Sequence, residues 1–209
     1  MASKVDEDKR TLLHTAASVG NQQIVEYFLR QNPATVNCAD EEGWTPLLSS
    51  CSAGHEKIVE ALIAAGAHPA ATNASGRTAL HYAASKGRAS LVSLLLEKGA
   101  PVNAQDELGA TPLHRACSAG KTATVRELVE QGRAILDIKD RQGQTPLFVA
   151  CTANSRSAAL YLASKGADVE AEDKEEETPL SAAAAFSGLR EALVDLVMGK
   201  TSIEDMLDS

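Results

Sequence analysis

Histidines and cysteines recur at fixed intervals along the chain, and both residue types can do chemistry. The histidines stand three residues after a threonine, at His14, His81 and His114. The cysteines stand six residues after a threonine, at Cys51, Cys117 and Cys151. An imidazole can bind a metal or act as a general base, and an exposed thiolate can act as a nucleophile.

The surroundings of these residues do not favour that chemistry. No acidic or cysteine ligand recurs at metal-site spacing beside the histidines. The sequence has no CxxC, GxGxxG, P-loop, GxSxG or HExxH motif. We therefore interpret the histidines as structural and the cysteines as small buried core residues. We expect no catalytic residue, no bound metal and no cofactor.

The spacing itself is the main signal, because it belongs to a repeat that fills most of the chain. Six segments such as TALHYAA and TPLHRAC begin at Thr11, Thr45, Thr78, Thr111, Thr145 and Thr178. The steps between these threonines are 34, 33, 33, 34 and 33 residues. A seven-residue pattern does not stay in phase over this distance by chance.

Each unit predicts two helices and a turn. The threonine is an N-cap and a proline follows it in four units, so a short inner helix begins there. Glycines end this helix at residues 20, 54, 87 and 120, with Asn154 in the fifth unit. A second amphipathic helix ends at glycines 66, 99, 132 and 166, and Asn32-Pro33 serves this purpose in the first unit. A polar turn with a glycine then precedes the next threonine, although Glu176 replaces this glycine in the last unit.

These elements predict an all-α fold of about six helix-turn-helix units joined by β-hairpin loops. We expect one repeat domain over residues 11–198. A polar segment, residues 1–10, precedes it, and an acidic tail, residues 199–209, follows it.

Charge and hydropathy limit the classes of partner. The net charge is −8 and the pI is about 5.2, so the chain lacks the basic footprint of a general nucleic-acid binder. No apolar run approaches the ~20 residues that span a bilayer, and Met1–Arg10 has no signal-peptide core. We expect a cytoplasmic and nuclear protein with reduced thiols, no membrane contact and a monomeric state on its own.

The pattern of helix, turn, helix and hairpin with T-P-L-H-x-A at a 33-residue period resembles the ankyrin repeat. This resemblance implies a curved solenoid in which each unit contacts its neighbours. It also implies that the histidine bonds near the threonine cap and the adjacent hairpin. Ankyrin repeats bind proteins, and their hairpin tips point toward the concave side.

Particular strings resemble the gankyrin-type family of ankyrin proteins. They are TALHYAASKGR with LLLEKGAPVNAQD, GWTPL after an acidic pair, and DKEEETPL. The resemblance implies a chaperone for assembly of the proteasome regulatory particle. Its partner would be the C-terminal domain of one proteasomal ATPase subunit, held in the concave face by largely charged contacts.

The resemblance also implies which residues bind. The matching positions are the bases Arg10 and Lys86, the acids Asp8, Glu41 and Glu42, and Trp44 beside them. Equivalent positions in neighbouring units add Arg77, Tyr82, Ser85, Glu107, Arg115 and Ser118. Two points stay open: Trp44 could be an interface anchor or a packed residue, and the acids could steer a basic partner or only solvate a turn.

The sequence departs from the animal members of this family in two respects. It has no counterpart of the atypical repeat that precedes the unit at Thr11, and it lacks an LxCxE string, so retinoblastoma-protein binding is not expected. The alternatives are an ankyrin-repeat regulator of a kinase or transcription factor, similar to a cell-cycle inhibitor, and a generic adaptor. An enzyme is the least favoured class.

Overall fold

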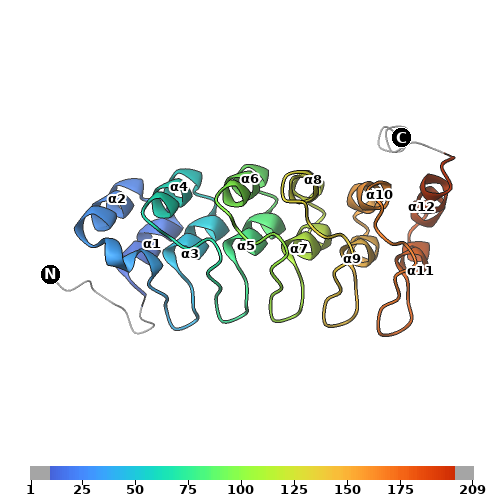
Figure 1. The fold of residues 1–209 in the computed structure, drawn as a ribbon, viewed down its shortest axis with the longest axis horizontal. Coiled ribbons are helices and arrows are strands. Elements are labelled where there is room, and N and C mark those ends of the chain that lie inside the picture. Colours follow the sequence, from blue (N-terminus) through green and yellow to red (C-terminus); the bar gives the residue numbers. More distant parts are fainter. Residues whose placement is uncertain (1–9, 201–209) are drawn as a thin grey trace.

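The computed structural model describes residues 10–200, and these form six pairs of short helices stacked in a row (Figure 1). The inner helices are α1 Leu12–Val19, α3 Pro46–Ala53, α5 Ala79–Lys86, α7 Pro112–Ser118, α9 Pro146–Thr152 and α11 Pro179–Ala182. The outer helices are α2 Gln22–Gln31, α4 Glu56–Ala64, α6 Ala89–Glu97, α8 Thr122–Glu130, α10 Arg156–Ser164 and α12 Leu189–Val197. The predicted all-α solenoid is confirmed. The polar segment before Arg10 and the tail after Lys200 lie outside the described residues.

Local sequence fixes where each inner helix begins and ends. In α3 the hydroxyl of Thr45 accepts a hydrogen bond from the Leu48 N–H at 3.3 Å, and Pro46 fills the first position, where no N–H is needed. Gly54 ends the helix with a φ of 92°, in the left-handed region that glycine tolerates. Asn154 adopts a φ of 52° at the corresponding position of the fifth unit, as predicted.

Three units depart from the expected pattern. In the first, α2 is followed by a 3-10 helix, Pro33–Asn37. In the fourth, Arg133 and not Gly132 takes the positive φ, at 52°. A Cβ on Gly132 would lie 2.6 Å from the Leu128 carbonyl oxygen, so this glycine is needed for close packing. In the sixth, α11 is short and continues into a second 3-10 helix, Ala183–Ala185.

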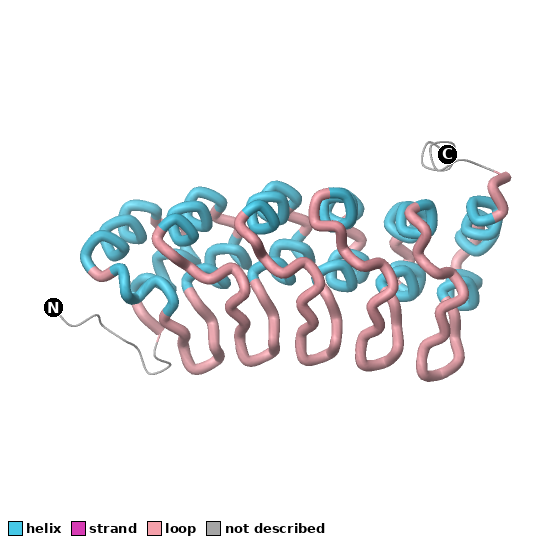
Figure 2. Tube along the Cα trace, viewed as in Figure 1, coloured by secondary structure: helices cyan, strands magenta, loops and turns pink. Residues whose placement is uncertain are grey.

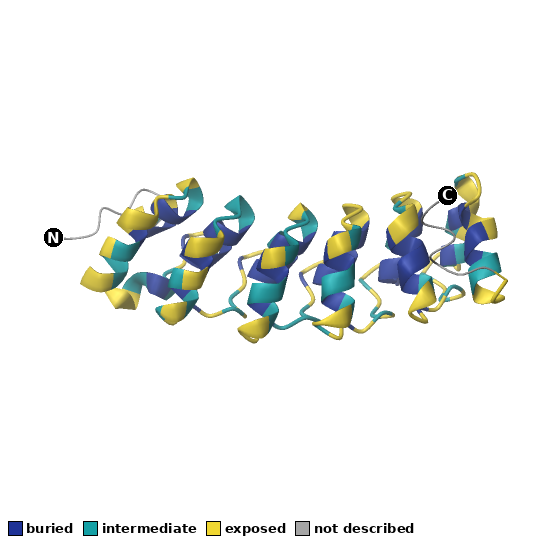
Figure 3. Ribbon diagram, turned by 90° about the horizontal axis from the view of Figure 1, so that it is seen from above, coloured by how far each residue is buried: buried dark blue, intermediate teal, exposed yellow. Residues whose placement is uncertain are grey.

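The core runs along the whole stack between the inner and outer helices (Figure 3). The sixth residue after each repeat threonine shows how each unit is buried by the unit that follows it. Five of these residues are fully buried, at Ala17, Cys51, Ala84, Cys117 and Cys151. Their counterpart Ala184 is exposed, since no described unit follows it. No unit buries its apolar face alone, so stability comes from neighbouring units.

The loops before the threonines project together along one edge of the stack (Figure 2). Each turn is closed by an Asp or Asn side chain that accepts the N–H groups two and four residues later, at Asp40, Asn73, Asp106, Asp140 and Asp173. Consecutive loops are joined by backbone hydrogen bonds such as Ala74 N–H to Glu42 O at 2.8 Å. Within residues 10–200 the loops carry an isolated bridge, Thr72 with Thr78, and no regular strand.

The last of these loops keeps the shape of the others without their glycine, and this predicts a stabilising substitution. Glu176 has a φ of 62°, where Gly143 in the preceding loop has 85°. Because a side chain in this region costs about 1 kcal/mol, Glu176→Gly should raise the free energy of unfolding by up to that amount, measured by urea denaturation. The control Glu175→Gly removes the same charge from the same loop, where φ is not positive, and should be neutral or destabilising. Equal or lower stability for Glu176→Gly would contradict this account of the loop.

Candidate protein-binding surface

The recurring histidines link each inner helix to the next loop. In the third unit, the backbone N–H of Thr78 donates to Nδ1 of His81 at 3.1 Å. Nδ1 is therefore an acceptor, so Nε2 carries the proton and donates to the carbonyl of Ala110 at 3.0 Å. His14 and His114 make the same pair of contacts in their own units. The predicted structural role of the three histidines is confirmed.

Burial keeps these imidazoles neutral. It lowers the pKa of His81 to about 4, although the hydrogen bond to Ala110 and the charge of Asp106 act in the opposite direction. The pKa values of His14 and His114 are also lowered, again mainly by burial. All the hydrogen-bonding capacity of His81 is used inside the fold, so it is not available to abstract a proton from a substrate.

The recurring cysteines are core residues. Burial raises the pKa of the Cys51 and Cys151 thiols to about 12 and raises that of Cys117 as well. A thiol with such a pKa is not a nucleophile at neutral pH. Cys38 is half-buried. Among residues 10–200 there is no cluster of three or more histidine, cysteine or acidic side chains that could hold a metal ion.

The predicted site residues of the third and fourth units come together around Asp106. The Nε of Arg77 lies 3.4 Å from its Oδ2 and the Nε of Arg115 lies 3.0 Å from the same atom. Burial by itself would raise the pKa of Asp106, but the hydrogen bonds and charge of Arg115, with the N–H groups of Leu108 and Ala110, lower it. The carboxylate stays ionised and holds both guanidinium groups in place. Since two cations share one anion, the group keeps a positive charge.

A hollow of about 240 Å³ lies over this group. Its lining includes five of the predicted residues, Arg77, Tyr82, Ser85, Arg115 and Ser118, together with His81 and Ala119. The Tyr82 hydroxyl accepts a hydrogen bond from Asn73 Nδ2 at 2.8 Å, and Ser85 donates to the Tyr82 carbonyl at 3.2 Å. Arg77, Arg115, Tyr82 and Ser85 are therefore held by bonds within the protein before any partner arrives.

A second hollow, of about 380 Å³, adjoins it toward the first unit. Its lining includes Arg10, Glu42 and Trp44, which were predicted, and Ser49, which was not. Trp44 packs against Tyr82 with ring centroids 4.7 Å apart, so the two hollows share an aromatic boundary. Trp44 is half-buried and contacts the core, so it is both a packed residue and part of the surface. We call the two hollows and the loop tips beside them the inner surface.

The remaining predicted residues are not part of one hollow. Glu41, Lys86 and Glu107 are exposed and line neither. Arg10, which lines the second hollow, also makes an ion pair with Asp40 at 3.3 Å. Asp8 lies outside the described residues.

Two of the residues that the sequence analysis missed hold predicted residues in place. Asp106 and Asn73 position the arginines and Tyr82, and the Oγ of Ser49 is buried without a hydrogen-bond partner in the described part of the chain. Asp106 and Asn73 had a detectable signal. Asp or Asn recurs at residues 40, 73, 106, 140 and 173, in step with the threonines. Nothing in the sequence distinguishes Ser49.

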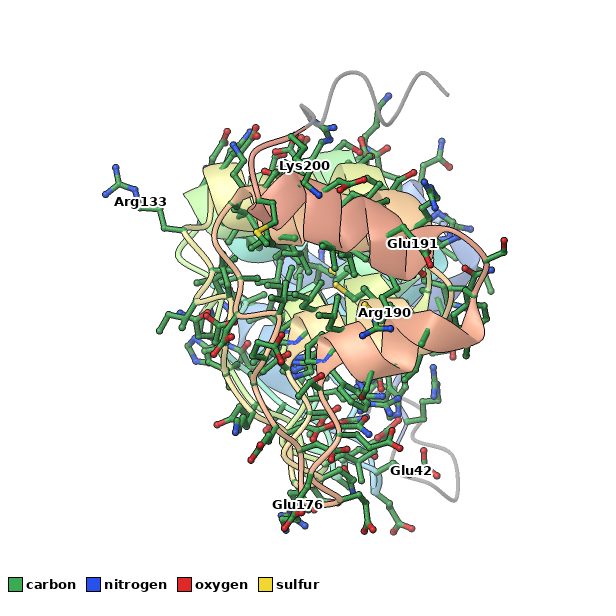
Figure 4. All side chains as sticks on the ribbon, turned by 90° about the vertical axis from the view of Figure 1, so that its right-hand side faces the viewer. Glu42, Arg133, Glu176, Arg190, Glu191 and Lys200 are labelled. Carbon is green, nitrogen blue, oxygen red and sulfur yellow. The ribbon has the colours of Figure 1, made fainter. Side chains whose placement is uncertain are left out.

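The loop edge beside the hollows is acidic. Glu42 and Glu176 both lie at this edge, although they belong to loops far apart in the chain (Figure 4). The acids Glu41, Glu42 and Glu107 are exposed, and their loops lie on either side of the loop that carries Arg77, joined to it by the backbone bonds Ala74 N–H to Glu42 O and Glu107 N–H to Ser75 O. We call Arg77 and Arg115 the basic floor and the loop tips with Glu41, Glu42 and Glu107 the acidic edge. The inner surface therefore presents positive and negative charge side by side, which suits a partner with complementary charges.

The chain belongs to the ankyrin-repeat family. The family model for ankyrin repeats, three copies long, matches residues 2–73, 67–136 and 100–173. Such repeats are protein-interaction modules that are typically non-catalytic, so this chain is a protein-binding scaffold. Among the described helices, none is both long and apolar enough to cross a membrane.

Curated relatives match over limited stretches. The chain is 44% identical over 62 residues to the 26S proteasome non-ATPase regulatory subunit 10 of Dictyostelium discoideum, covering 30% of this chain and 27% of that protein. It is 48% identical over 46 residues to the human subunit of that name, covering 22% and 20%. It is also 44% identical over 70 residues to human SH3 and multiple ankyrin repeat domains protein 2, covering 34% and 4%. The matches thus span about a quarter or less of these relatives.

The neutral histidines predict a pH dependence of stability. The folded pKa of His81 is about 4, below its ordinary value of 6.5, so the unfolded chain binds more protons between these values. The stability is fully present above pH 6.5 and is lost as the pH falls toward 4, by roughly 3 kcal/mol for His81. Urea denaturation between pH 7 and pH 5 measures this slope.

Two variants test whether the slope comes from this histidine. His81→Gln should be less stable at pH 7 but should lose less stability on acidification. His68→Gln removes an exposed imidazole from a loop and should leave the wild-type slope unchanged. A His81→Gln slope equal to that of the wild type would contradict the assignment.

Proposed function

We propose that this chain is a gankyrin-type chaperone of the proteasome regulatory particle. In this proposal its inner surface holds the C-terminal domain of one proteasomal ATPase subunit in the cytoplasm and nucleus, without turnover. The matches to subunit 10 of the 26S proteasome in two distant organisms support it, since this chain shares stretches with that protein. The sequence strings that resemble gankyrin-type proteins support it as well.

The observation that carries the proposal is the shared Asp106 carboxylate with its two arginines. Arg77 and Arg115 retain 35% and 22% exposure of their side chains, whereas Asp106 has 1%. The buried Asp106 thus fixes both guanidinium groups, and their other side is accessible to a partner. Fixing them in advance reduces the entropy that a partner's carboxylates must overcome on binding. An acidic segment of a helical domain fits this floor.

The acidic edge selects a second feature of the partner. Glu41, Glu42 and Glu107 lie at loop tips beside the basic floor. A partner that places acids over Arg77 and Arg115 therefore needs bases at its margin. Such a two-sign pattern contributes to specificity and association rate more than to affinity, and it discriminates among related ATPase domains.

The match to human SH3 and multiple ankyrin repeat domains protein 2 favours a generic adaptor as the second candidate. An adaptor would use the same inner surface for a partner outside the proteasome. The ankyrin-repeat regulator of a kinase or transcription factor is a third candidate of the same kind. Only the identity of the partner separates these functions.

A binding panel with the C-terminal domains of the six proteasomal ATPases tests the proposal by calorimetry. We expect one domain to bind selectively. Arg77→Gln and Glu42→Lys should each weaken that binding by about tenfold, because the first removes and the second reverses a charge of the inner surface. Raising the salt concentration should also weaken it.

Matched variants on the outer helices control for net charge. Lys98→Glu and Glu60→Lys reverse exposed charges beside α6 and within α4, away from the inner surface, and should leave the affinity unchanged. Binding to none of the six domains would overturn the proposed function. Equal weakening by the outer-helix variants would show that the inner surface is not the contact.

A further inference from the structure

The hollow over Asp106 is lined by hydrogen-bond donors that the fold does not use. Each guanidinium group carries about five N–H donors. Arg77 gives one of them to Asp106, and Arg115 gives two to the same carboxylate. Neither arginine makes another hydrogen bond or ion pair within residues 10–200. Most of the N–H donors of these two lining residues are therefore available to a ligand.

The other polar groups of the hollow suit the same kind of ligand. The Tyr82 hydroxyl accepts a hydrogen bond from Asn73, and its own proton has no acceptor in the described part of the chain. Ser118 is exposed, and the described residues give its hydroxyl no partner. No acidic side chain is among the residues that line the hollow. Two cations and two free hydroxyl donors together suit an oxyanion.

The pair of arginines favours a phosphate over a carboxylate. A carboxylate has two oxygens, and it meets one guanidinium group with both of them. Arg77 lies at the end of a loop and Arg115 lies on α7, so each presents its own planar group to the hollow. A phosphate monoester has three strong acceptor oxygens and carries about 1.5 to 2 negative charges near neutral pH. It can therefore bond to both arginines at once.

The size of the hollow limits the ligand to one short group. Its volume of about 240 Å³ corresponds to roughly eight water molecules at about 30 Å³ each. Sites for drug-sized molecules begin at about 300 Å³. The phosphate of a phosphoserine or phosphothreonine is carried on a short side chain and fits this space. A whole nucleotide does not.

The acidic edge disfavours extended polyanions. Glu107 is exposed and follows Asp106 in the loop beside the hollow, and the whole chain has a net charge of −8. A nucleic acid or an anionic lipid surface would bring many negative charges against these acids. A peptide can instead place a single phosphate over the arginines and basic residues over Glu42 and Glu107. The charge pattern thus favours a phosphorylated protein segment.

We infer that the hollow over Asp106 binds a phosphoserine or phosphothreonine side chain of a protein partner, flanked by basic residues. Arg77 and Arg115 bond to the phosphate oxygens, and the Tyr82 and Ser118 hydroxyls donate to the oxygens that remain. The inference rests on the proposed function for the use of the inner surface. It adds a regulation, because a partner that is phosphorylated at this position binds more tightly than the same partner without the phosphate.

Calorimetry with the full chain tests the inference. The probe is a short peptide of lysine and alanine residues with one phosphoserine at its centre, and two control peptides carry glutamate or serine there. We expect the phosphoserine peptide to bind at least about tenfold more tightly than the glutamate peptide. Inorganic phosphate should compete with it more strongly than chloride does at equal ionic strength. A nucleoside monophosphate should compete no better than inorganic phosphate, because its base and sugar do not fit.

Three variants test whether the phosphate lies on the two arginines. Arg77→Gln should weaken binding of the phosphoserine peptide by about tenfold, because Asp106 then cancels the one remaining arginine charge. Arg77→Lys keeps the charge but lacks the planar group, so it should recover only part of the loss. Arg30→Gln removes an arginine whose side chain is 78% exposed on α2, and it should leave the affinity unchanged. Circular dichroism confirms that the variants are folded.

Equal affinities for the phosphoserine and glutamate peptides would overturn the inference, and so would equal weakening by Arg77→Gln and Arg30→Gln. Tighter binding of the nucleoside monophosphate than of the peptide would assign the hollow to a free nucleotide and would also overturn it. The panel of ATPase domains gives a separate answer. Selective binding of one domain without a preference for phosphoserine would support the proposed function and reject this inference. Preference for phosphoserine without binding to any domain would do the reverse.

Discussion

The hydrogen bond from a neutral histidine to the carbonyl of the next loop is the contact on which the surface depends. In His81 it connects the cap of one helix, at Thr78, with the loop that ends at Ala110 in the next unit. Burial favours the neutral imidazole, and only this form can accept at Nδ1 while donating at Nε2. One side chain therefore fixes the start of its own helix and the position of the neighbouring loop relative to that helix.

The position of that loop decides where the binding residues lie. Asp106 closes the loop and also holds Arg77 from one unit and Arg115 from another. The basic floor therefore spans two units, and its geometry requires their correct stacking. Backbone bonds between loops, such as Glu107 N–H to Ser75 O at 3.0 Å, keep the acidic edge in register with it. The fold and the site share the same contacts.

Most of the helix boundaries and the all-α solenoid could be predicted from the sequence, because the same capping residues recur at the same spacing in six units. The threonine caps, the glycine stops and the role of the histidines follow from residue type and spacing. The partner of Arg77 could not be predicted, because it lies 29 residues away and is specified by how units stack. The positive φ of Arg133 was missed for a similar reason, since close packing and not the helix end requires Gly132.

We propose that a proteasomal ATPase domain binds the loops and inner helices of the middle units. Hydrogen exchange of the amides with and without the ATPase domain tests it most directly. The account predicts slower exchange in the loops at residues 73–77 and 106–110 and around Tyr82 and Arg115. It predicts unchanged exchange in the outer helices α4 and α6. Protection confined to the outer helices, with none on the loops, would contradict it.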